Sequence, residues 1–414
     1  MKSKTLKKFV ILIAFVLFGG ACVRVADPLT AIEKRQLNTA EIELVSSDNR
    51  FGVKTFKNMA LSAGDSNVFI SPLSISMALG MTLNGAAGET RIAMKETLEL
   101  HSLTQQKINE SYLSLITLLT QLDPKVIFKI ANSIWYRDYI SFKQEFINTN
   151  KHYFNAHTQS LNFGDPLSLV TINQWVSDNT HGKIPKIINQ INPDDIMFLI
   201  NAIYFKGIWT YRFKPELTQQ SNFNHPNGNS VPCQLMHQER VFSYLKNEEI
   251  QAINLPYGDG DFRMAIILPE NQTPINTIIQ NMSDEQLYIW LNSFHDQKGI
   301  LEFPKFKFAY EKRLNHVLSK LGMAIAFDQE RADFTNLYDG SGKAYISEVK
   351  HKSFIQVDEE GTEAAAATSV TISFTSVGDE FYMRVDRPFI FILYDNHSKT
   401  ILFIGKINEP IWEN

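Results

Sequence analysis

Residues able to perform chemistry are present in this 414-residue chain, but they form none of the familiar catalytic arrangements. There is no G-x-S-x-G nucleophile elbow, no H-E-x-x-H pair, no phosphate-binding loop and no dinucleotide fingerprint after a strand pattern. The ten histidines are scattered, and no two stand at metal-ligand spacing within one expected element. We therefore expect no enzyme activity, no metal site and no cofactor.

Single histidines and cysteines also favour structural roles. His351 lies in the strand-like run EVKHKSF, where a histidine is usually a core or interface residue bonded to a neighbour. Only two cysteines occur, Cys22 and Cys233, so we expect no disulfide or metal scaffold. The apolar surroundings of Cys233 (VPCQLM) favour a small core residue over a nucleophile.

The first 22 residues, MKSKTLKKFVILIAFVLFGGAC, have the pattern of an export signal. Four lysines precede an apolar stretch of about ten residues, which is short for a membrane span. Small residues then lead to Cys22, which fits either a bacterial lipoprotein signal with Cys22 lipidated or plain cleavage after Ala21. We expect an exported protein, secreted or membrane-anchored through Cys22.

The bulk composition indicates one ordinary globular protein. The chain is 44% apolar and 20% charged, which is enough apolar material for a large core. A net charge of −4 and a pI near 6.2 argue against nucleic acid or an anionic membrane as the main partner. No repeat or low-complexity linker divides residues 38–414, so we expect a linker at 23–37 followed by a single domain.

One unusual segment is VDEEGTEAAAATSVTISFTSVGDEF, residues 357–381. Its alanines favour a helix, but the β-branched residues that follow favour a strand. Alternate positions separate into two faces. The even face is small and then increasingly apolar: Thr362, Ala364, Ala366, Thr368, Val370, Ile372 and Phe374. The odd face has the only charge and most of the hydroxyls: Glu363, Ala365, Ala367, Ser369, Thr371, Ser373 and Thr375.

This pattern predicts a strand with one buried face, yet the residues before it, 359–361, offer little turn chemistry to pair it with a neighbour. A segment suited to be a strand but not placed in a sheet suggests a conformational switch. The alternative is an ordinary edge strand followed by a loop.

The elements around this segment alternate between helix and strand. We expect helices over 38–63, from Pro72 to about Asn84, and over 167–180, with Ser71 as the cap of the second. We expect hairpins at Gly258-Asp259-Gly260 and between the apolar runs 389–393 and 400–404.

These residues resemble the serpin family over about Asn38 to Pro410. The hinge EEGTEAAAAT is similar to that of inhibitory members. The other matching blocks are NVFISPLSISMAL, NQWVSDNTHGKI, NAIYFKGIWTYRF, LPYGDGDFRMAIILP, FPKFKF, LGMAIAFDQERADFTNL and RPFIFIL…TILFIGKINEP.

The resemblance implies an α+β fold with a central five-stranded mixed sheet, further sheets, about eight to nine helices and an exposed reactive loop at about 359–380. It also implies the function of a suicide-substrate inhibitor. A protease cuts the loop, and the cut loop inserts into the central sheet and traps the acyl-enzyme. A non-inhibitory carrier, binding protein or chaperone with the same fold is the alternative.

The resemblance also assigns residues to sites. The hinge comprises Glu359, Glu360, Gly361, Thr362, Glu363, Ala364, Ala365, Ala366, Ala367 and Thr368. A hydrogen-bonded polar cluster, the shutter, comprises Ser71, Ser74, Asn201 and His351. The breach, where insertion begins, comprises Trp209, Lys305 and Glu359, with an ion pair expected between the last two.

The reactive bond follows from the distance to the hinge. Fourteen residues past Gly361 places it at Thr375-Ser376, and a shorter spacing places it at Phe374-Thr375. The first fits an elastase-like or subtilisin-like protease, and the second a chymotrypsin-like or cathepsin-like one. No Arg or Lys lies between Ala364 and Asp379, so trypsin-like targets are disfavoured. We expect a monomer with no heparin site.

Overall fold

The computed structural model describes residues 34–225, 228–270, 273–340, 343–362 and 380–413. By internal contacts the chain forms one compact unit, Leu37–Asn414, and a separate N-terminal unit, Met1–Gln36. The larger unit contains helices and two sheets, in agreement with the α+β class expected from the sequence.

The helices begin and end at the signals present in the sequence. Asn38 and Glu41 form a reciprocal capping box at the start of α1. Ser71 caps α2, and Pro72 occupies its first turn. In the described residues nine α-helices occur: α1 Thr39–Ser62, α2 Pro72–Leu83, α3 Gly88–Thr97, α4 Gln105–Gln121, α5 Gln144–Phe154, α6 Pro166–Asn179, α7 Ile275–Asn281, α8 Asp284–Asn292 and α9 Asn315–Leu318.

The central sheet has the strand order β10-β11-β12-β4-β2-β3. Its five long strands confirm the expected mixed sheet, because β2 and β3 are parallel and the other neighbours antiparallel. A sixth strand, the two-residue β12, lies between β4 and β11. The strands are β2 Val126–Arg137, β3 His157–Leu161, β4 Met197–Ile208, β10 Phe306–Arg313, β11 Lys350–Val357 and β12 Gly361–Thr362.

The second sheet contains both predicted hairpins, β7–β8 and β14–β15. Gly258 and Gly260, both with positive φ, form the turn of the first. The strands of this second sheet are β1 Val68–Ile70, β5 Gln219–Asn224, β6 Ser230–Lys246, β7 Ile250–Tyr257, β8 Phe262–Pro269, β9 His295–Pro304, β13 Phe381–Arg384, β14 Phe389–Asp395 and β15 Ile401–Ile407.

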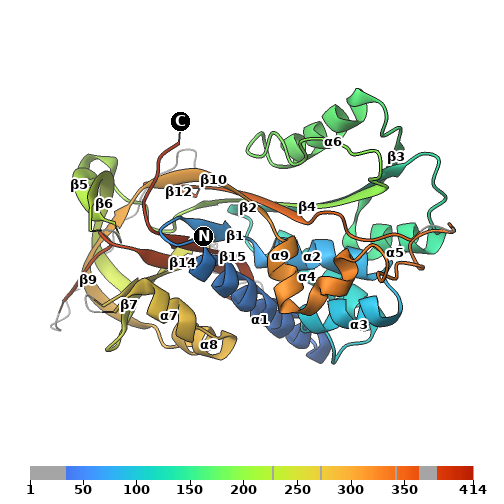
Figure 1. The fold of residues 1–414 in the computed structure, drawn as a ribbon. Helices are drawn as coiled ribbons and strands as arrows, with labels where there is room; N and C mark the ends of the chain where they lie inside the picture. The colour runs from blue at the N-terminus through green and yellow to red at the C-terminus, as the bar shows by residue number, and fades with distance from the viewer. Residues whose placement is uncertain (1–33, 226–227, 271–272, 341–342, 363–379, 414) are drawn as a thin grey trace, which may run out of the picture. The chain divides into compact units, whose positions relative to one another are not determined.

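Both faces of the central sheet are covered by helices near β2 and β4. In Figure 1, α6 lies on one side of these strands and α2 on the other. A small core cluster that includes Trp135, Ile172 and Val176 packs α6 against β2 and β4. The large core, which contains α1, α2 and most of the second sheet, lies on the opposite face.

Candidate functional site: the hinge and the gap beside it

The hinge begins inside the central sheet. Thr362 is opposite Val357 of β11 and Gly207 of β4, and Gly361 is opposite Ile208. The chain reaches this position through a tight turn in which Asp358 Oδ1 accepts the N–H groups of Glu360 and Gly361, at 3.1 and 3.3 Å. The expectation of little turn chemistry here was wrong, because the Asp358 side chain supplies it.

Trp209, one of the predicted breach residues, directly follows β4 and holds this turn. Its backbone N–H donates to Glu360 O at 2.9 Å, and its indole N–H donates to Asp358 O at 2.9 Å. The indole stacks on the Tyr257 ring, with centroids 4.2 Å apart and planes 17° apart. A buried aromatic pair with a satisfied N–H is a rigid support for the hinge.

The ion pair predicted for the breach is present. Lys305 Nζ lies 2.7 Å from Glu359 Oε2, and Thr218 donates its hydroxyl to Glu359 Oε1 at 2.8 Å. Burial by itself would raise the pKa of Glu359, but the hydrogen bonds from Lys305 and Thr218 outweigh it and lower this pKa below its usual 4.5. Glu359 is therefore ionised and fixed at neutral pH.

The first even position of the predicted strand faces the core. Thr362 is 5% exposed, and its hydroxyl is 2.7 Å from the Tyr257 hydroxyl. The rest of the even face, and the hinge residues from Glu363 to Thr368, lie outside the described residues. Phe374, Thr375 and Ser376 of the two candidate reactive bonds, and Cys22, also lie outside them.

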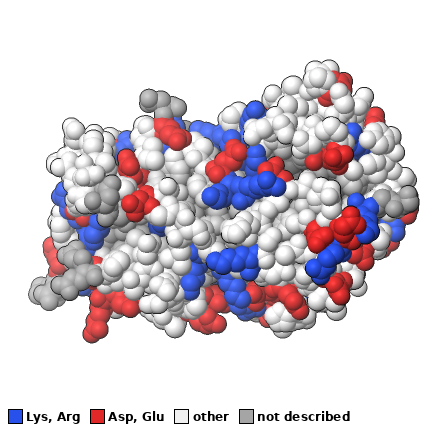
Figure 2. Space-filling view, viewed as in Figure 1, with Lys and Arg blue, Asp and Glu red and all other residues white. Residues whose placement is uncertain are grey.

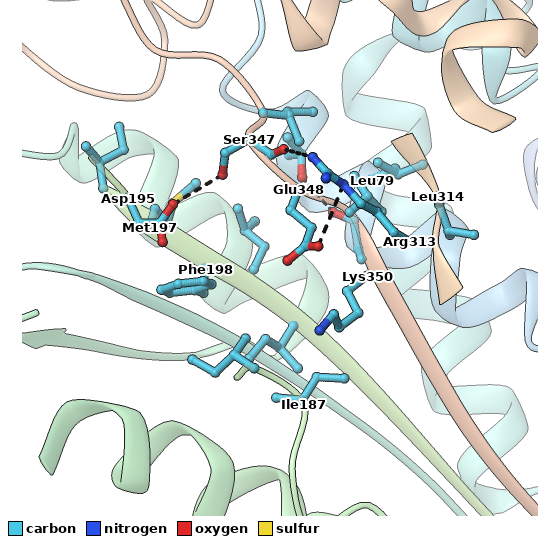
Figure 3. A pocket seen from close by; sticks show the side chains of 18 of the residues that line it. Leu79, Ile187, Asp195, Met197, Phe198, Arg313, Leu314, Ser347, Glu348 and Lys350 are labelled. Carbon is cyan, nitrogen blue, oxygen red and sulfur yellow. Dashed lines mark hydrogen bonds and ion pairs between the residues drawn. The ribbon is translucent and has the colours of Figure 1, made fainter. Parts of the chain in front are cut away.

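Beyond Thr362 the two strands that flank the hinge separate. In the described residues β4 and β11 have no direct backbone pairing, and a cavity of about 630 Å³ lies along their separated ends. Figure 3 shows Met197 and Phe198 of β4 on one side and Glu348 and Lys350 near β11 on the other. We call this space the gap.

Three of the shutter residues, Ser74, Asn201 and His351, line the gap, and Ser71 joins them in one hydrogen-bonded chain. His351 Nε2 accepts the backbone N–H of Ser71 at 3.1 Å, and Ser71 Oγ accepts the N–H of Ser74 at 3.2 Å. Ser74 Oγ donates to Asn201 O at 3.5 Å. Asn201 in turn donates to Asn132 Oδ1 at 2.7 Å. The start of α2 thereby links β11 to β4 where these strands do not pair with each other.

His351 is neutral in this cluster. It is 5% exposed, and burial lowers its pKa from 6.5 to about 4. Acceptance of a hydrogen bond at Nε2 places the ring proton on Nδ1. The imidazole is therefore a fixed acceptor under β11, which agrees with a hydrogen-bonded core histidine.

At the end of the gap far from the hinge, one side-chain hydrogen bond joins its two sides. Ser347 Oγ donates to Asp195 Oδ1 at 3.3 Å, as Figure 3 shows. Arg137 fixes the Asp195 segment by donating to the carbonyls of Asn192, Pro193 and Asp195.

Charges around the mouth of the gap are mixed in sign. Glu311 lies between Lys350 and Lys352, at 3.1 and 3.2 Å. On the face of the molecule drawn in Figure 2, blue and red side chains are likewise interspersed. The described part of the chain contains no group of three or more His, Cys, Asp or Glu side chains that could hold a metal ion.

Cys233 is a free, buried thiol, as the sequence indicated. Burial raises its pKa to about 11, so it is protonated and unreactive at neutral pH. Within the described ranges, no helix has the length and apolar character that a membrane span requires.

Sequence reasoning missed four residues that support the site: Asn132, Thr218, Tyr257 and Asp358. Only Asp358 had a local signal, since an Asp three residues before a Gly is typical of a tight turn. The other three contact the site from distant segments, and no pattern near them in the sequence indicates this role.

Comparison with known proteins identifies the family. The model of the family "Serpin (serine protease inhibitor)" matches residues 46–410. A serpin-like protein of Thermococcus kodakarensis is 34% identical over 89% of this chain and 86% of its own length. The leukocyte elastase inhibitor of Sus scrofa is 33% identical over 89% of this chain and 100% of its own length. The chain therefore belongs to the serpin family.

Solved structures agree with this assignment. The thermophilic serpin tengpin in its native state is 31% identical, with a TM-score of 0.79 over 91% of this chain and 96% of its own. Human thyroxine-binding globulin in complex with thyroxine is 26% identical, with a TM-score of 0.82 over 90% of this chain and 100% of its own. The relatives thus include both an elastase inhibitor and a thyroxine-binding protein.

Proposed function

We propose that this protein is a suicide-substrate inhibitor of a serine or cysteine endopeptidase. The observation that carries the proposal is the seated hinge, because β12 already lies between β4 and β11 at the head of the gap. A strand that continued from Thr362 would enter this gap. Family membership, with an elastase inhibitor among the relatives, supports the same conclusion.

The proposed reaction is ordinary peptide-bond cleavage that stops halfway. The protease nucleophile attacks the carbonyl of the reactive bond, and the new amine leaves with the segment that continues into β13. The other part of the loop stays joined to the protease as an ester or thioester. It then follows Thr362 into the gap, carrying the protease with it. The chain itself supplies no catalytic group.

Pocket preference restricts the target. The carbonyl side of the cut bond is Thr375 or Phe374, so the protease has a small or an aromatic-accepting primary pocket. The absence of Arg and Lys from 364–379 disfavours trypsin-like enzymes. We propose an elastase-like, subtilisin-like, chymotrypsin-like or cathepsin-like target that meets this protein as a monomer.

A carrier role is the second candidate. The observation that favours it is the structural similarity to thyroxine-binding globulin. The small side chains of the hinge favour the inhibitor role over the carrier role. In an inhibitor the even face of the hinge must enter between β4 and β11, where large side chains would not fit.

A protease panel tests the proposal. The full chain is incubated with serine and cysteine proteases, and covalent complexes are sought on a denaturing gel. Mass spectrometry of the released fragment then distinguishes cleavage after Thr375 from cleavage after Phe374. The inhibitor proposal predicts a complex with at least one protease of the classes above. A loop that every protease cuts without a complex would favour the carrier.

The even face provides a matched pair of variants. Ala366→Arg places a charge on the face that must enter the core, and we expect it to convert the inhibitor into a substrate. Ala365→Arg places the same charge on the opposite face and should leave complex formation largely intact. If Ala366→Arg still formed the covalent complex at full stoichiometry, this result would contradict insertion with the even face toward the core.

The export signal, the linker at 23–37 and lipidation of Cys22 remain predictions from the sequence. We propose an exported protein on that basis.

A further inference from the structure

A short segment after the second sheet runs along the free edge of the central sheet. Lys307 of β10 donates its backbone N–H to Ile411 O at 2.7 Å, and Glu413 donates its N–H to Lys307 O at 2.8 Å. Ala309 donates its N–H to Glu413 Oε2 at 3.0 Å. Residues 411–413, which we call the edge clip, therefore occupy backbone groups that the edge strand would otherwise expose.

The same segment reaches the breach. The Trp412 ring lies under two lysines, with its centroid 5.1 Å from Lys305 Nζ and 5.9 Å from Lys307 Nζ. Lys305 is the residue that pairs with Glu359 of the hinge. A cation over an aromatic face is attracted to it, so Trp412 favours the position in which Lys305 meets Glu359.

The residues just before the edge clip are anchored beside the second sheet. Asn67, next to β1, accepts the backbone N–H groups of Asn408 and Glu409 at 2.8 and 3.0 Å. Asn67 also donates to Glu409 O at 2.7 Å. A segment fixed at this end and paired with β10 at the other ties the outer strand of the central sheet to the second sheet.

The edge clip lies past residue 410, where the family match ends.

We propose that the edge clip restrains β10 and β11 and so sets how readily the gap opens for the hinge. Because β12 is seated between β4 and β11, a strand that continues from it needs space between these two strands. The β10–β11 pair must therefore move relative to β4 for the gap to open. The edge clip opposes this motion by holding β10 to Asn67. The proposal rests on the proposed function, since it concerns the control of the same insertion.

Amide hydrogen exchange of the full chain tests the restraint directly. Glu413→Pro removes both the N–H given to Lys307 and the carboxylate that Ala309 uses. Trp412→Ala removes the aromatic face, and Tyr288→Ala, an exposed aromatic on α8, is its matched control. We expect both clip variants to raise exchange in 306–313 and 350–357 roughly tenfold, and to leave 250–269 unchanged.

A second readout follows the consequence. The variants are incubated without protease, and the rate of conversion to a form that survives heating is measured. We expect the clip variants to convert faster than the wild type and Tyr288→Ala to match it. Unchanged exchange in β10 and β11, or an equal increase in Tyr288→Ala, would overturn the proposal. Complex formation with protease by the fresh wild type tests the proposed function separately.

Discussion

The buried side chain of His351 connects β11 to the start of α2. Its ring lies under β11 and accepts a hydrogen bond from the first turn before α2. A protonated imidazole would lose this acceptor and would place a charge in a buried site. The neutral form is therefore the one that the fold requires.

We expect stability to depend on pH through this residue. The pKa of His351 is about 4 in the folded chain and 6.5 in the unfolded chain, so the unfolded chain binds more protons between these values. The free energy of unfolding is therefore not reduced by His351 above pH 6.5. It falls by up to about 3 kcal/mol through this residue as the pH drops to 4. Denaturant unfolding of wild type and His351→Gln over pH 4–7 measures it.

The His351→Gln variant keeps an acceptor for Ser71 but does not titrate. Comparison with it cancels Asp48, whose pKa burial raises to about 7 and whose effect on stability has the opposite sign. The stability advantage of the wild type over this variant should shrink as the pH falls. An advantage that stays constant from pH 7 to 4 would show that His351 does not titrate as proposed.

At the scale of the element, β12 depends on the absence of a side chain at Gly361. Gly361 has a φ of 153°, and an added Cβ would lie 2.1 Å from Gly207 O and 2.8 Å from Ile208 Cα. Both atoms belong to the backbone of β4, so they cannot move aside without breaking the strand.

We therefore predict that Gly361→Ala displaces β12 from β4, at a cost of about 1–3 kcal/mol. The N–H groups of Trp209 and Phe213, which donate to Glu360 O and Glu359 O, should then exchange faster. The same variant should raise the number of inhibitor molecules consumed per trapped protease. Amide exchange and titration against a target protease measure the two effects.

Gly228→Ala is the matched control for this prediction. Gly228 also has a positive φ, 86°, but an added Cβ there meets nothing within 4 Å. The control separates backbone strain from the clash with β4. Equal effects of the two substitutions on Trp209 exchange would show that contact with Gly207 is not what positions the hinge.

At the scale of the whole molecule, cleavage of the loop should increase heat stability. If about ten residues join β4 and β11, and each adds roughly 1 kcal/mol, the melting temperature should rise by about 20 °C or more. Cleavage by a protease that is not a target, followed by calorimetry, measures this increase. The melting temperature of Ala366→Arg should rise much less after cleavage. A wild type whose melting temperature does not rise after cleavage would favour the carrier role.

The sequence by itself determined the local features. Side-chain periodicity and caps predicted α1, α2, α6 and the two hairpins, and the family blocks predicted the central sheet and the Lys305–Glu359 pair. These features could be predicted because each depends on a few neighbouring residues or on a motif shared by the family.

Only the tertiary structure decided what surrounds the hinge. Tyr257 under Thr362, Thr218 beside Glu359, Asn132 behind Asn201 and the gap between β4 and β11 all depend on strand order and register. Residues far apart in the chain meet at these points, and hydrophobic periodicity is the same whether or not they meet. The edge clip depends in the same way on where β10 lies, because its main bonds are between backbone groups that every sequence has.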